Sequence, residues 1–366
     1  MKICHLTTVH PRNDIRVFYK MCKSIAEINV EISLIVADGK GDDTVDQVNI
    51  IDVGSYQSSR FKRLFVAQRK MLQTALELNA DCYQLHDPEL LKIAPKLKRR
   101  GKKVIYDSHE DVPKQILYKK WLGPLFMRKI ISKVYDWYEK NTVLKLDGLI
   151  SVIEEITEKF KCPNMITIKN YPIVEEYQAH VKINDNRKKK IIYVGSISEE
   201  RGIMDYLDAM KKLKSDFTLV LVGSFSSIQL KEKCLNHPAW REVEYLGFQP
   251  MEEVVKLLGE CFMGLCVLHP EQNYLTSLPT KGFEYASAQL PMIMSNFDYW
   301  RDYFEGTCIF VQPKNSDGIL KAIETLINDH SKYEAIQKTQ FNRSKIYSWE
   351  NEAKKLKGFY DKIVSS

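Results

Sequence analysis

Residues 276–293 (TSLPTKGFEYASAQLPMI) place a lysine and a glutamate on one face of an expected helix. The helix should begin after Pro279 and end before Pro291, and a buried strand should follow it. Lys281, one turn in, can add positive charge to the helix start and bind a diphosphate, while Glu284 can accept hydrogen bonds from a ribose diol. These residues alone leave open the alternative of a surface i,i+3 ion pair worth roughly 0.3 kcal/mol.

Histidines and acids follow three expected strands in the first half of the chain. They occur in residues 10–16 (HPRNDIR), 86–89 (HDPE) and 107–111 (DSHED). Histidine is the natural proton acceptor near neutral pH, so such loops could bind and deprotonate hydroxyl groups. The same residue types can bind a metal ion, although no two histidines are paired at helical i,i+4 spacing. Hydrogen bonds confined to each loop are the third interpretation, and all three remain open.

Small residues follow the expected strands in the second half. Gly195-Ser196, Gly223-Ser224 and Leu246-Gly247 each end an apolar run. Residues without large side chains let a ligand approach the backbone closely. The polar residues 269–277 lead into the helix described above, so we assign them to the same candidate site.

Two series of short apolar runs must position these loops. Continuous apolar runs that alternate with amphipathic stretches such as 14–28 and 61–78 predict two doubly wound α/β domains with parallel sheets. The expected strands are 2–6, 32–36, 48–53, 82–85, 103–106, 148–152 and 165–168 in the first series, and 191–194, 218–222, 243–246, 264–267, 292–294 and 308–311 in the second.

The chain of 366 residues is long enough for two domains. We predict an N-terminal domain at 1–172, a linker at 173–189, a C-terminal domain at 190–348, and a final helix at 349–366 that returns towards the first domain. Ligands of open α/β sheets bind beyond the carboxyl ends of the strands, so we expect the site in a cleft between two facing domains. Neither half contains GxGxxG or GxxxxGK[ST], which argues against dehydrogenases and P-loop enzymes.

The positive charge is concentrated in the first half. Residues 1–170 contain 29 Lys and Arg against 21 Asp and Glu, whereas the remaining 196 residues contain 25 against 26. Residues 60–70 carry five basic residues and residues 114–133 carry six, with no acid in either segment. In the second segment the basic residues alternate with large apolar ones, which suits a surface that rests on anionic lipid. A solvated helix face is the alternative, and no nucleic-acid-binding motif accompanies the charge.

Three further observations indicate a cytoplasmic protein. Eight cysteines are scattered without a CxxC spacing, which favours reduced thiols over disulfides or a zinc site. The first residues contain no long apolar run, so we expect no signal peptide. No stretch of about 18 apolar residues occurs, so we expect no membrane-spanning helix.

The stretch LPTKGFEYASAQLPMI resembles the nucleotide-binding signature of family 4 of the retaining glycosyltransferases, which have the GT-B fold of two facing Rossmann-like domains. Other stretches resemble the family in the same order along nearly the whole chain: HPRNDIRVFYK, LHDPELL, YDSHEDVP, KNYP, YVGSISEERGI, YLGF and YSWENEAKKL. The chain is most similar to bacterial hexosyltransferases of capsule, O-antigen (lipopolysaccharide) and exopolysaccharide biosynthesis.

The resemblance implies roles at three matching positions. Glu284 corresponds to the glutamate that holds the ribose, and His109 corresponds to the acceptor-side histidine. The family's other glutamate, which contacts the donor sugar, falls at Thr276 in this chain. Asn273 or Glu271 is then expected to contact the sugar in its place.

The resemblance also implies how the diphosphate and the base are held. The arginine that commonly follows the first glycine is Ser196 here, so Arg201 and Lys281 are expected to form the cation pair. Backbone around Gly247 is expected to hold the base. The other residues expected at the substrates are Asp14, Arg16, His86, Ser277 and Leu278.

The implied reaction moves a sugar from a nucleoside-diphosphate sugar to a saccharide acceptor. Side-chain cations and the helix start would stabilise the charge on the departing phosphate, so we expect no metal and no cofactor. The basic, apolar segment favours a lipid-linked acceptor and a peripheral position on the inner face of the cell membrane. Two other functions remain open: a sugar-nucleotide epimerase of the same architecture, and a catalytically inactive scaffold, which Thr276 would suit.

Overall fold

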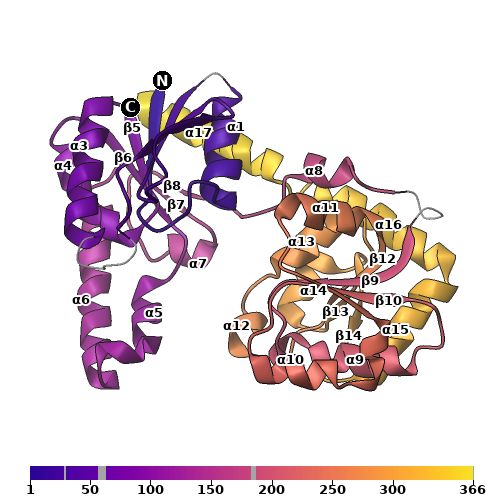
Figure 1. The fold of residues 1–366 in the computed structure, drawn as a ribbon. Coiled ribbons are helices and arrows are strands. Elements are labelled where there is room, and N and C mark those ends of the chain that lie inside the picture. Colours follow the sequence, from indigo (N-terminus) through magenta and orange to yellow (C-terminus); the bar gives the residue numbers. More distant parts are fainter. Residues whose placement is uncertain (29, 57–62, 183–186, 366) are drawn as a thin grey trace. The chain divides into compact units, whose positions relative to one another are not determined.

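The computed structural model describes residues 1–28, 30–56, 63–182 and 187–365. The chain divides into two compact units, Met1–Asn170 with Asn351–Ser366, and Tyr171–Glu350. Each unit contains one sheet with helices against it (Figure 1). The predicted α/β class with two doubly wound sheets is confirmed.

The first unit has an eight-stranded sheet of order β3-β4-β2-β1-β5-β6-β7-β8. All neighbouring strands are parallel except β3, which pairs antiparallel with β4 at the edge. The sequence did not predict β3, because this strand has only three residues, two of them polar, and is largely exposed. The strands are β1 (Lys2–Leu6), β2 (Glu31–Val36), β3 (Asp43–Val45), β4 (Val48–Asp52), β5 (Cys82–Leu85), β6 (Lys103–Ser108), β7 (Gly148–Ser151) and β8 (Met165–Thr167).

The expected helix 14–28 is a π-helix, η1 (Ile15–Cys22), followed by the short α1 (Lys23–Ala26). Asp14 caps η1 by accepting hydrogen bonds from the backbone of Arg16 and Val17. The expected helix 61–78 begins outside the described residues and continues as η2 (Arg63–Ala67) and α3 (Gln68–Leu78). The other helices are η3 (Pro88–Lys92), α4 (Ala94–Lys98), α5 (Val112–Tyr118), η4 (Lys120–Leu122), α6 (Leu125–Val143), α7 (Glu154–Thr157) and α17 (Trp349–Ser365).

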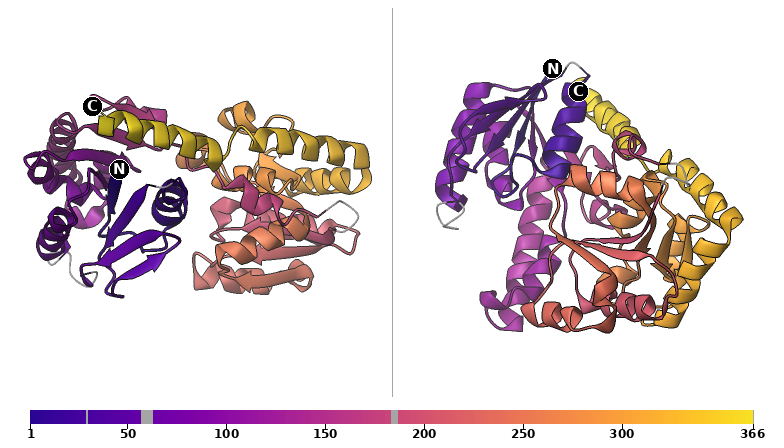
Figure 2. Two further views of the ribbon diagram at one scale, coloured as in Figure 1. Left: turned by 90° about the horizontal axis from the view of Figure 1, so that it is seen from above. Right: turned by 45° about the vertical axis from the view of Figure 1, so that its right-hand side comes forward.

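The C-terminal helix α17 packs on the first sheet, and both views in Figure 2 draw it beside the N-terminal strands. A Cβ atom on Gly148 in β7 would lie 2.5 Å from Ile363 and 2.9 Å from Phe359, so this strand needs glycine under the helix. Side chains of neighbouring residues in a strand point to opposite faces. Cys4 and Leu6 belong to the apolar core on the other face, so His5 points towards the α17 face.

The second unit has a six-stranded parallel sheet of order β11-β10-β9-β12-β13-β14. Its strands are β9 (Lys188–Val194), β10 (Thr218–Val222), β11 (Val243–Gly247), β12 (Cys261–Cys266), β13 (Met292–Ser295) and β14 (Cys308–Val311). Its helices are α8 (Val174–Gln178), η6 (Glu199–Arg201), α9 (Ile203–Lys212), α10 (Ile228–Leu235), η7 (Pro238–Glu242), α11 (Met251–Glu260), α12 (Gln272–Leu275), α13 (Thr280–Ser287), α14 (Asp298–Phe304), α15 (Ser316–Asn328) and α16 (His330–Ser344).

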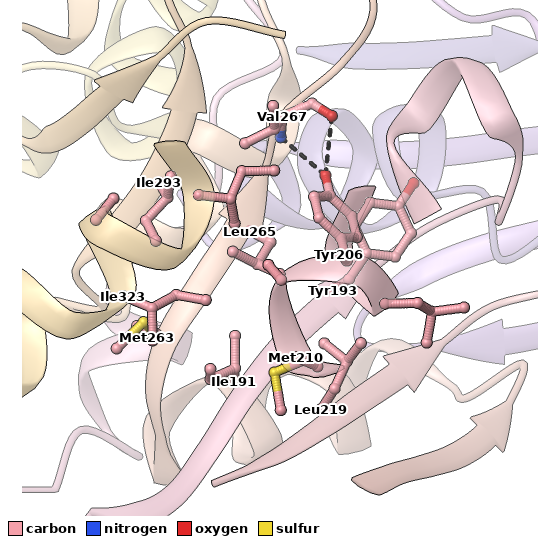
Figure 3. Packing of buried hydrophobic residues seen from close by; sticks show 14 of the residues in the cluster. Ile191, Tyr193, Tyr206, Met210, Leu219, Met263, Leu265, Val267, Ile293 and Ile323 are labelled. Carbon is pink, nitrogen blue, oxygen red and sulfur yellow. Dashed lines mark hydrogen bonds between the residues drawn. The ribbon is translucent and has the colours of Figure 1, made fainter. Parts of the chain in front are cut away.

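Both faces of this sheet are buried under helices, which explains the continuous apolar runs of its strands. Figure 3 shows one of these cores, in which Tyr206 of α9 accepts a hydrogen bond from the Val267 amide and donates one to the Val267 carbonyl. These two bonds satisfy the buried hydroxyl group and fix the residue that follows β12.

Residues 173–189 are not a simple linker. They contain α8, whose Val174 and Tyr177 are buried, and they end in the first residues of β9. Tyr177 belongs to the hydrophobic core of the second unit, so α8 is part of that unit. The polar residues within 173–189 led to the prediction of a linker. Residues 183–186 of the expected linker lie outside the described residues.

All eight cysteines are free thiols, and seven are buried. Burial raises the pKa of each cysteine for which a shift is resolved; in Cys162 the pKa rises to about 11. Among the described residues, no helix is both long and apolar enough to cross a membrane.

Candidate functional site

Two cations meet beside Gly195, where β9 ends. A Cβ atom on Gly195 would lie 2.8 Å from Lys281 Nζ and 3.3 Å from Arg201 Nη1. Arg201 comes from the turn η6 after β9, and Lys281 comes from the first turn of α13. Gly195 has φ +127°, a backbone conformation that favours glycine. The structure therefore brings together the two cations that were expected on a diphosphate.

Aromatic side chains surround these cations. Lys281 Nζ lies 4.8 Å from the centre of the Tyr193 ring, and Arg201 Nε donates to the Tyr274 hydroxyl group at 3.4 Å. Burial lowers the pKa of Lys281 below its usual value, and the Arg201 charge lowers it further. Burial also opposes the charge of Arg201, but the hydrogen bond to Tyr274 and the neighbouring Tyr193 raise its pKa. A partly dehydrated pair of like charges binds an anion strongly, because the anion relieves their repulsion.

Helix α13 begins as the sequence predicted but ends at Ser287, three residues before Leu290. Gln289 stops it by adopting φ +47°. Pro279 occupies the N-cap position without a side-chain hydrogen bond to the helix start. The Gly282 amide donates to the Pro279 carbonyl, so among the described residues the Thr280 and Lys281 amides are the ones that can meet an anion here.

Glu284 lies one turn beyond Lys281 on α13 and is partly buried. Thr276 and Ser277 are exposed and Leu278 is half-buried in the segment before the helix. The backbone of Asn273 lies in α12, but its side chain is outside the described part of the structure. These residues lie in α13 or in the segment before it. Their expected contacts with the sugar or the ribose remain predictions.

Glycines at the neighbouring strand ends bring three backbone segments close together. A Cβ atom on Gly223 would lie 2.0 Å from the Gly195 carbonyl oxygen, and the Gly223 amide donates to the Gly247 carbonyl at 2.7 Å. Gly247 has φ +66° and ends β11, and Ser196 is exposed beside Gly195. Three backbone segments therefore lie close together at this edge of the second sheet, and the approach of a ligand to them remains a prediction.

In the first unit, three histidines from different loops lie together. The ring centres of His10 and His109 are 5.4 Å apart, and those of His86 and His109 are 5.7 Å apart. His10 Nδ1 lies 3.3 Å from Asp14 Oδ2. The three loops predicted to form one group therefore do so.

Arg16 and His86 are both buried, and they form hydrogen bonds with other residues of the first unit. Arg16 donates to Asp107 Oδ1 at 3.0 Å and to the Ile168 carbonyl at 3.0 Å. His86 Nε2 forms a hydrogen bond with His5 Nδ1 at 2.8 Å. These contacts stabilise the unit itself, and the proposed substrate contacts of both residues remain predictions.

The acidic and basic side chains of this cluster have shifted pKa values. Burial disfavours ionised Asp107, but the Arg16 charge and the neighbouring histidines hold its pKa well below the usual value. Burial lowers the pKa of His109 to about 3; the Asp107 carboxylate opposes this shift, and the positive charge of Arg16 adds to it. His109 is therefore neutral near pH 7. Burial also disfavours ionised Asp14, but its hydrogen bond with His10 lowers the pKa of Asp14 to about 2 and raises that of His10.

Three of these groups also have the composition of a metal site. One ligand atom each from His86, Asp107 and His109 lie within 4.8 Å of one another. The guanidinium group of Arg16 already occupies one Asp107 oxygen, so a divalent cation there would bind beside a fixed positive charge.

Sequence reasoning missed four polar residues of these sites: His5, Gln84, Tyr360 and Tyr193. His5 and Gln84 lie inside apolar runs, KICHL and CYQL, and a polar residue in a buried parallel strand was the available signal. Tyr360 comes from α17, and only the folded chain brings it against β1.

Part of the sequence matches a known protein family. Residues 175–343, which are 169 of the 366 residues, match the family model described as glycosyl transferases group 1. No curated protein matches the chain by sequence. The matched segment lies in the second unit and contains Arg201, Lys281 and Glu284.

Solved structures resemble the whole chain. A glycosyltransferase from Rickettsia africae has a TM-score of 0.71 at 14% identity, with 99% of this chain and 98% of that chain covered. Anabaena HepE in complex with UDP-glucose has a TM-score of 0.68 at 14% identity, with both chains covered completely. Sucrose-phosphate synthase from Thermosynechococcus elongatus has a TM-score of 0.68 at 13% identity, covering 100% and 99%. The chain therefore has the fold of the GT-B glycosyltransferases, and its residues 175–343 match glycosyl transferases group 1.

Proposed function

We propose that this protein is a retaining glycosyltransferase that moves a sugar from a nucleoside-diphosphate sugar to a saccharide acceptor. The observation that carries the proposal is the pair Arg201 and Lys281 beside Gly195, next to the uncapped start of α13. This arrangement suits a diphosphate because two cations and free backbone amides converge on one place. Anabaena HepE, which has the same fold, is in complex with UDP-glucose, and this supports a sugar nucleotide as the ligand.

The two cations would act chiefly on the leaving group. As the bond between the sugar and the diphosphate breaks, negative charge grows on the departing phosphate oxygen. Arg201 and Lys281 stabilise that charge more strongly than water does, since they are held in place before the reaction starts. Glu284 holds the ribose, and residues 273–277 contact the sugar.

The acceptor hydroxyl group attacks the anomeric carbon from the side that the diphosphate leaves, so the configuration is retained. Its proton passes to the departing phosphate oxygen. His109, which is neutral near pH 7, forms a hydrogen bond with a substrate hydroxyl group and positions it. It need not carry the proton away by itself.

We propose a lipid-linked acceptor because of an unusual surface of the first unit. Helix α6 exposes an apolar stripe at spacings of four, four and three residues. The stripe consists of Phe126, Ile130, Val134 and Trp137, which are 59–68% exposed. Its opposite side, with Ser132 and Val143, is buried in the unit. A soluble helix normally has the reverse pattern, with its apolar side inward.

Basic residues adjoin the apolar stripe. Lys129 and Lys133 are exposed on α6, and Lys120 is exposed in η4 next to Trp121, which is 63% exposed. Apolar side chains bordered by lysines are typical of surfaces that enter the headgroup region of an anionic bilayer. We therefore place the protein on the inner face of the cell membrane, where it would extend a lipid-linked saccharide of a cell-surface polysaccharide.

The purified protein should be incubated with a panel of nucleoside-diphosphate sugars, first alone and then with lipid-linked saccharides. A transferase releases the nucleoside diphosphate slowly without an acceptor and rapidly with one. The anomeric configuration of the product, measured by NMR coupling constants, tests retention. A sugar that changes without release of the diphosphate would establish an epimerase instead, and no reaction with any sugar, despite nucleotide binding, would favour a scaffold.

A further inference from the structure

A buried tyrosine of α13 lies between two strands of the second sheet, next to the cation pair. Tyr285 is 0% exposed and comes one turn after Lys281 on the same helix. Its hydroxyl group accepts a hydrogen bond from the Val194 amide at 3.2 Å and donates one to the Leu265 carbonyl at 3.4 Å. Val194 immediately precedes Gly195, so these two bonds tie the helix to the backbone of the candidate site.

The two strands are β9 and β12, which are neighbours in the middle of the sheet. In a parallel sheet, the amide and carbonyl of one residue face the same neighbouring strand, and those of the next residue face the other. The Gly195 amide donates to the last residue of β10, so Val194 faces β12. The Gly264 amide donates to the carbonyl just before β13, so Leu265 faces β9. The Val194 amide and the Leu265 carbonyl are therefore placed to form the next hydrogen bond between the two strands.

The Tyr285 oxygen occupies the place of that bond. The register of β9 with β12 runs as far as Ile192 and Gly264, and beyond this pair the strands meet through the hydroxyl group. A direct bond would bring nitrogen and oxygen to about 2.9 Å, so an inserted oxygen atom keeps the strands farther apart. Gly264 makes room for the tyrosine, because a Cβ atom there would lie 2.7 Å from the ring.

A second tyrosine acts on the same strand from the opposite face of the sheet. Val267, the next residue that faces β9, gives its amide and its carbonyl to the Tyr206 hydroxyl group (Figure 3). Tyr206 belongs to the core on one face, and Tyr285 belongs to the core on the other. The chain order of the sheet reverses at β9, which has β10 on one side and β12 on the other. Ligands of open α/β sheets bind at such a point, so the space between these strand ends matters for binding.

We infer that Tyr285 is a positioning residue, whose hydroxyl group holds β9 and β12 apart and fixes Lys281 at its distance from Gly195. The diphosphate as ligand rests on the proposed function, whereas the spacing of the strands does not. At its other end α13 is held by Arg187, which donates to two carbonyls just after the helix at 2.9 and 3.1 Å. Loss of the Tyr285 hydroxyl group should therefore release the end of the helix that carries Lys281 and leave the fold intact.

The test is a double-mutant cycle of Tyr285→Phe and Lys281→Gln, measured by titration calorimetry of the intact protein. The probes are UDP, GDP and ADP with their monophosphates. Tyr285→Phe alone should weaken diphosphate binding roughly 10-fold, and monophosphate binding by less, because a single phosphate does not need both cations in place. In the Lys281→Gln protein the same change should weaken diphosphate binding by less than about 3-fold, since residues that act together are not additive. Equal losses in the two backgrounds would overturn the positioning role.

Gly264→Ala disturbs the same contact in a second way, because its methyl group pushes against the Tyr285 ring. It should also lower diphosphate affinity, and by less in the Lys281→Gln protein. A loss of the same size in both proteins would contradict the inference, even if Tyr285→Phe does not fold.

Tyr333→Phe is the matched control. Tyr333 is also buried in the second unit, and its hydroxyl group donates to the Phe262 carbonyl near the start of β12 at 2.7 Å. The substitution removes a buried tyrosine hydroxyl group without touching the carboxyl ends of β9 and β12. The control should leave the ratio of diphosphate to monophosphate affinity unchanged. A change as large as that of Tyr285→Phe would refute a specific role for Tyr285.

The outcomes separate this inference from the proposed function. If the cycle shows coupling but no sugar is transferred, the proposed function fails and the role of Tyr285 stands. If sugar is transferred but the cycle shows no coupling, the role of Tyr285 fails and the proposed function stands. If none of the probes binds the unmodified protein, the cation pair is not a diphosphate site and the inference is overturned with it.

Discussion

The surface of α6 gives the most quantitative prediction, in which three lysines are changed to glutamine to remove charge beside the apolar stripe. The variant Lys120→Gln/Lys129→Gln/Lys133→Gln should lose most of its binding to anionic vesicles. All three side chains are exposed, so the substitutions should leave the fold intact. Arg128 is kept, although its charge lies in the same segment, because its guanidinium group donates to the Leu117 carbonyl and joins α6 to α5.

The expected loss follows from the number of charges. Each lysine close to an anionic leaflet contributes about 1 kcal/mol, so three contribute ~3 kcal/mol. This corresponds to a roughly 100-fold weaker partition coefficient, because about 1.4 kcal/mol is a factor of ten. The effect should shrink as salt rises, since exposed charges are screened.

The apolar stripe should contribute a second part that salt does not remove. Phe126 is 64% exposed and Trp137 is 68% exposed. Aromatic side chains bury ~150–250 Å² each, so roughly 100–150 Å² of each remains to enter the bilayer. At ~25 cal/mol per Å², full insertion of either ring would contribute about 3 kcal/mol. Phe126→Ser/Trp137→Ser should therefore abolish the binding that persists at high salt.

The assay is co-sedimentation with vesicles of anionic and of neutral lipid at low and high salt. The control variant changes Lys211, Lys214 and Lys338 of the second unit, which are also exposed, and so removes the same charge elsewhere. The control should bind like the unmodified protein. The reasoning is refuted if the unmodified protein ignores anionic vesicles at low salt, or if the control loses as much binding as the α6 variant.

Three further outcomes are expected. Glu284→Ala should weaken nucleoside diphosphate binding measured by titration calorimetry, by on the order of 10-fold for the loss of a charged hydrogen bond, without lowering the melting temperature; unchanged affinity would return Glu284 to a surface ion pair. Arg201→Ala and Lys281→Ala should each lower the affinity for the diphosphate, and the loss should be smaller at high salt; a loss that does not depend on salt would point to misfolding. Because the pKa of Lys281 is below the usual lysine value, the unmodified protein should also lose diphosphate affinity as the pH rises and Lys281 is deprotonated. His109→Ala should slow transfer while nucleotide affinity stays the same, and if neither changes, His109 has only a structural role.

Much of this fold could be predicted from the sequence because its central strands are buried on both faces. Such strands are continuous apolar runs, and the central strands β1, β5 and β10 have the predicted bounds, as does the apolar edge strand β14. The exposed edge strand β3 lacks that signal. The end of α13 was misplaced because Gln289 leaves the helical conformation, and neither glycine nor proline marks that position.

The candidate site likewise contains some residues that the sequence could identify and others that it could not. Residues that follow strands, such as Arg201 and His109, could be found because the carboxyl ends of parallel strands collect at one edge. His5 and Gln84 could not, because their meeting depends on the register of β1 with β5, in which they are paired. The structural role of Arg128 was hidden for a similar reason, since it depends on how α5 packs on α6.

The packing of α17 has a consequence for how the protein is made. Residues 351–366 complete the first unit, yet 180 residues of the second unit separate them from Asn170 in the chain. A ribosome adds about 5–20 residues per second. Roughly 10–40 s therefore pass between the synthesis of Asn170 and that of the helix that covers Gly148 and His5. During that time its α17-facing surface is exposed, and synthesis of the second unit is completed before that of α17. Premature termination within α17 would therefore damage the domain that was synthesised earliest.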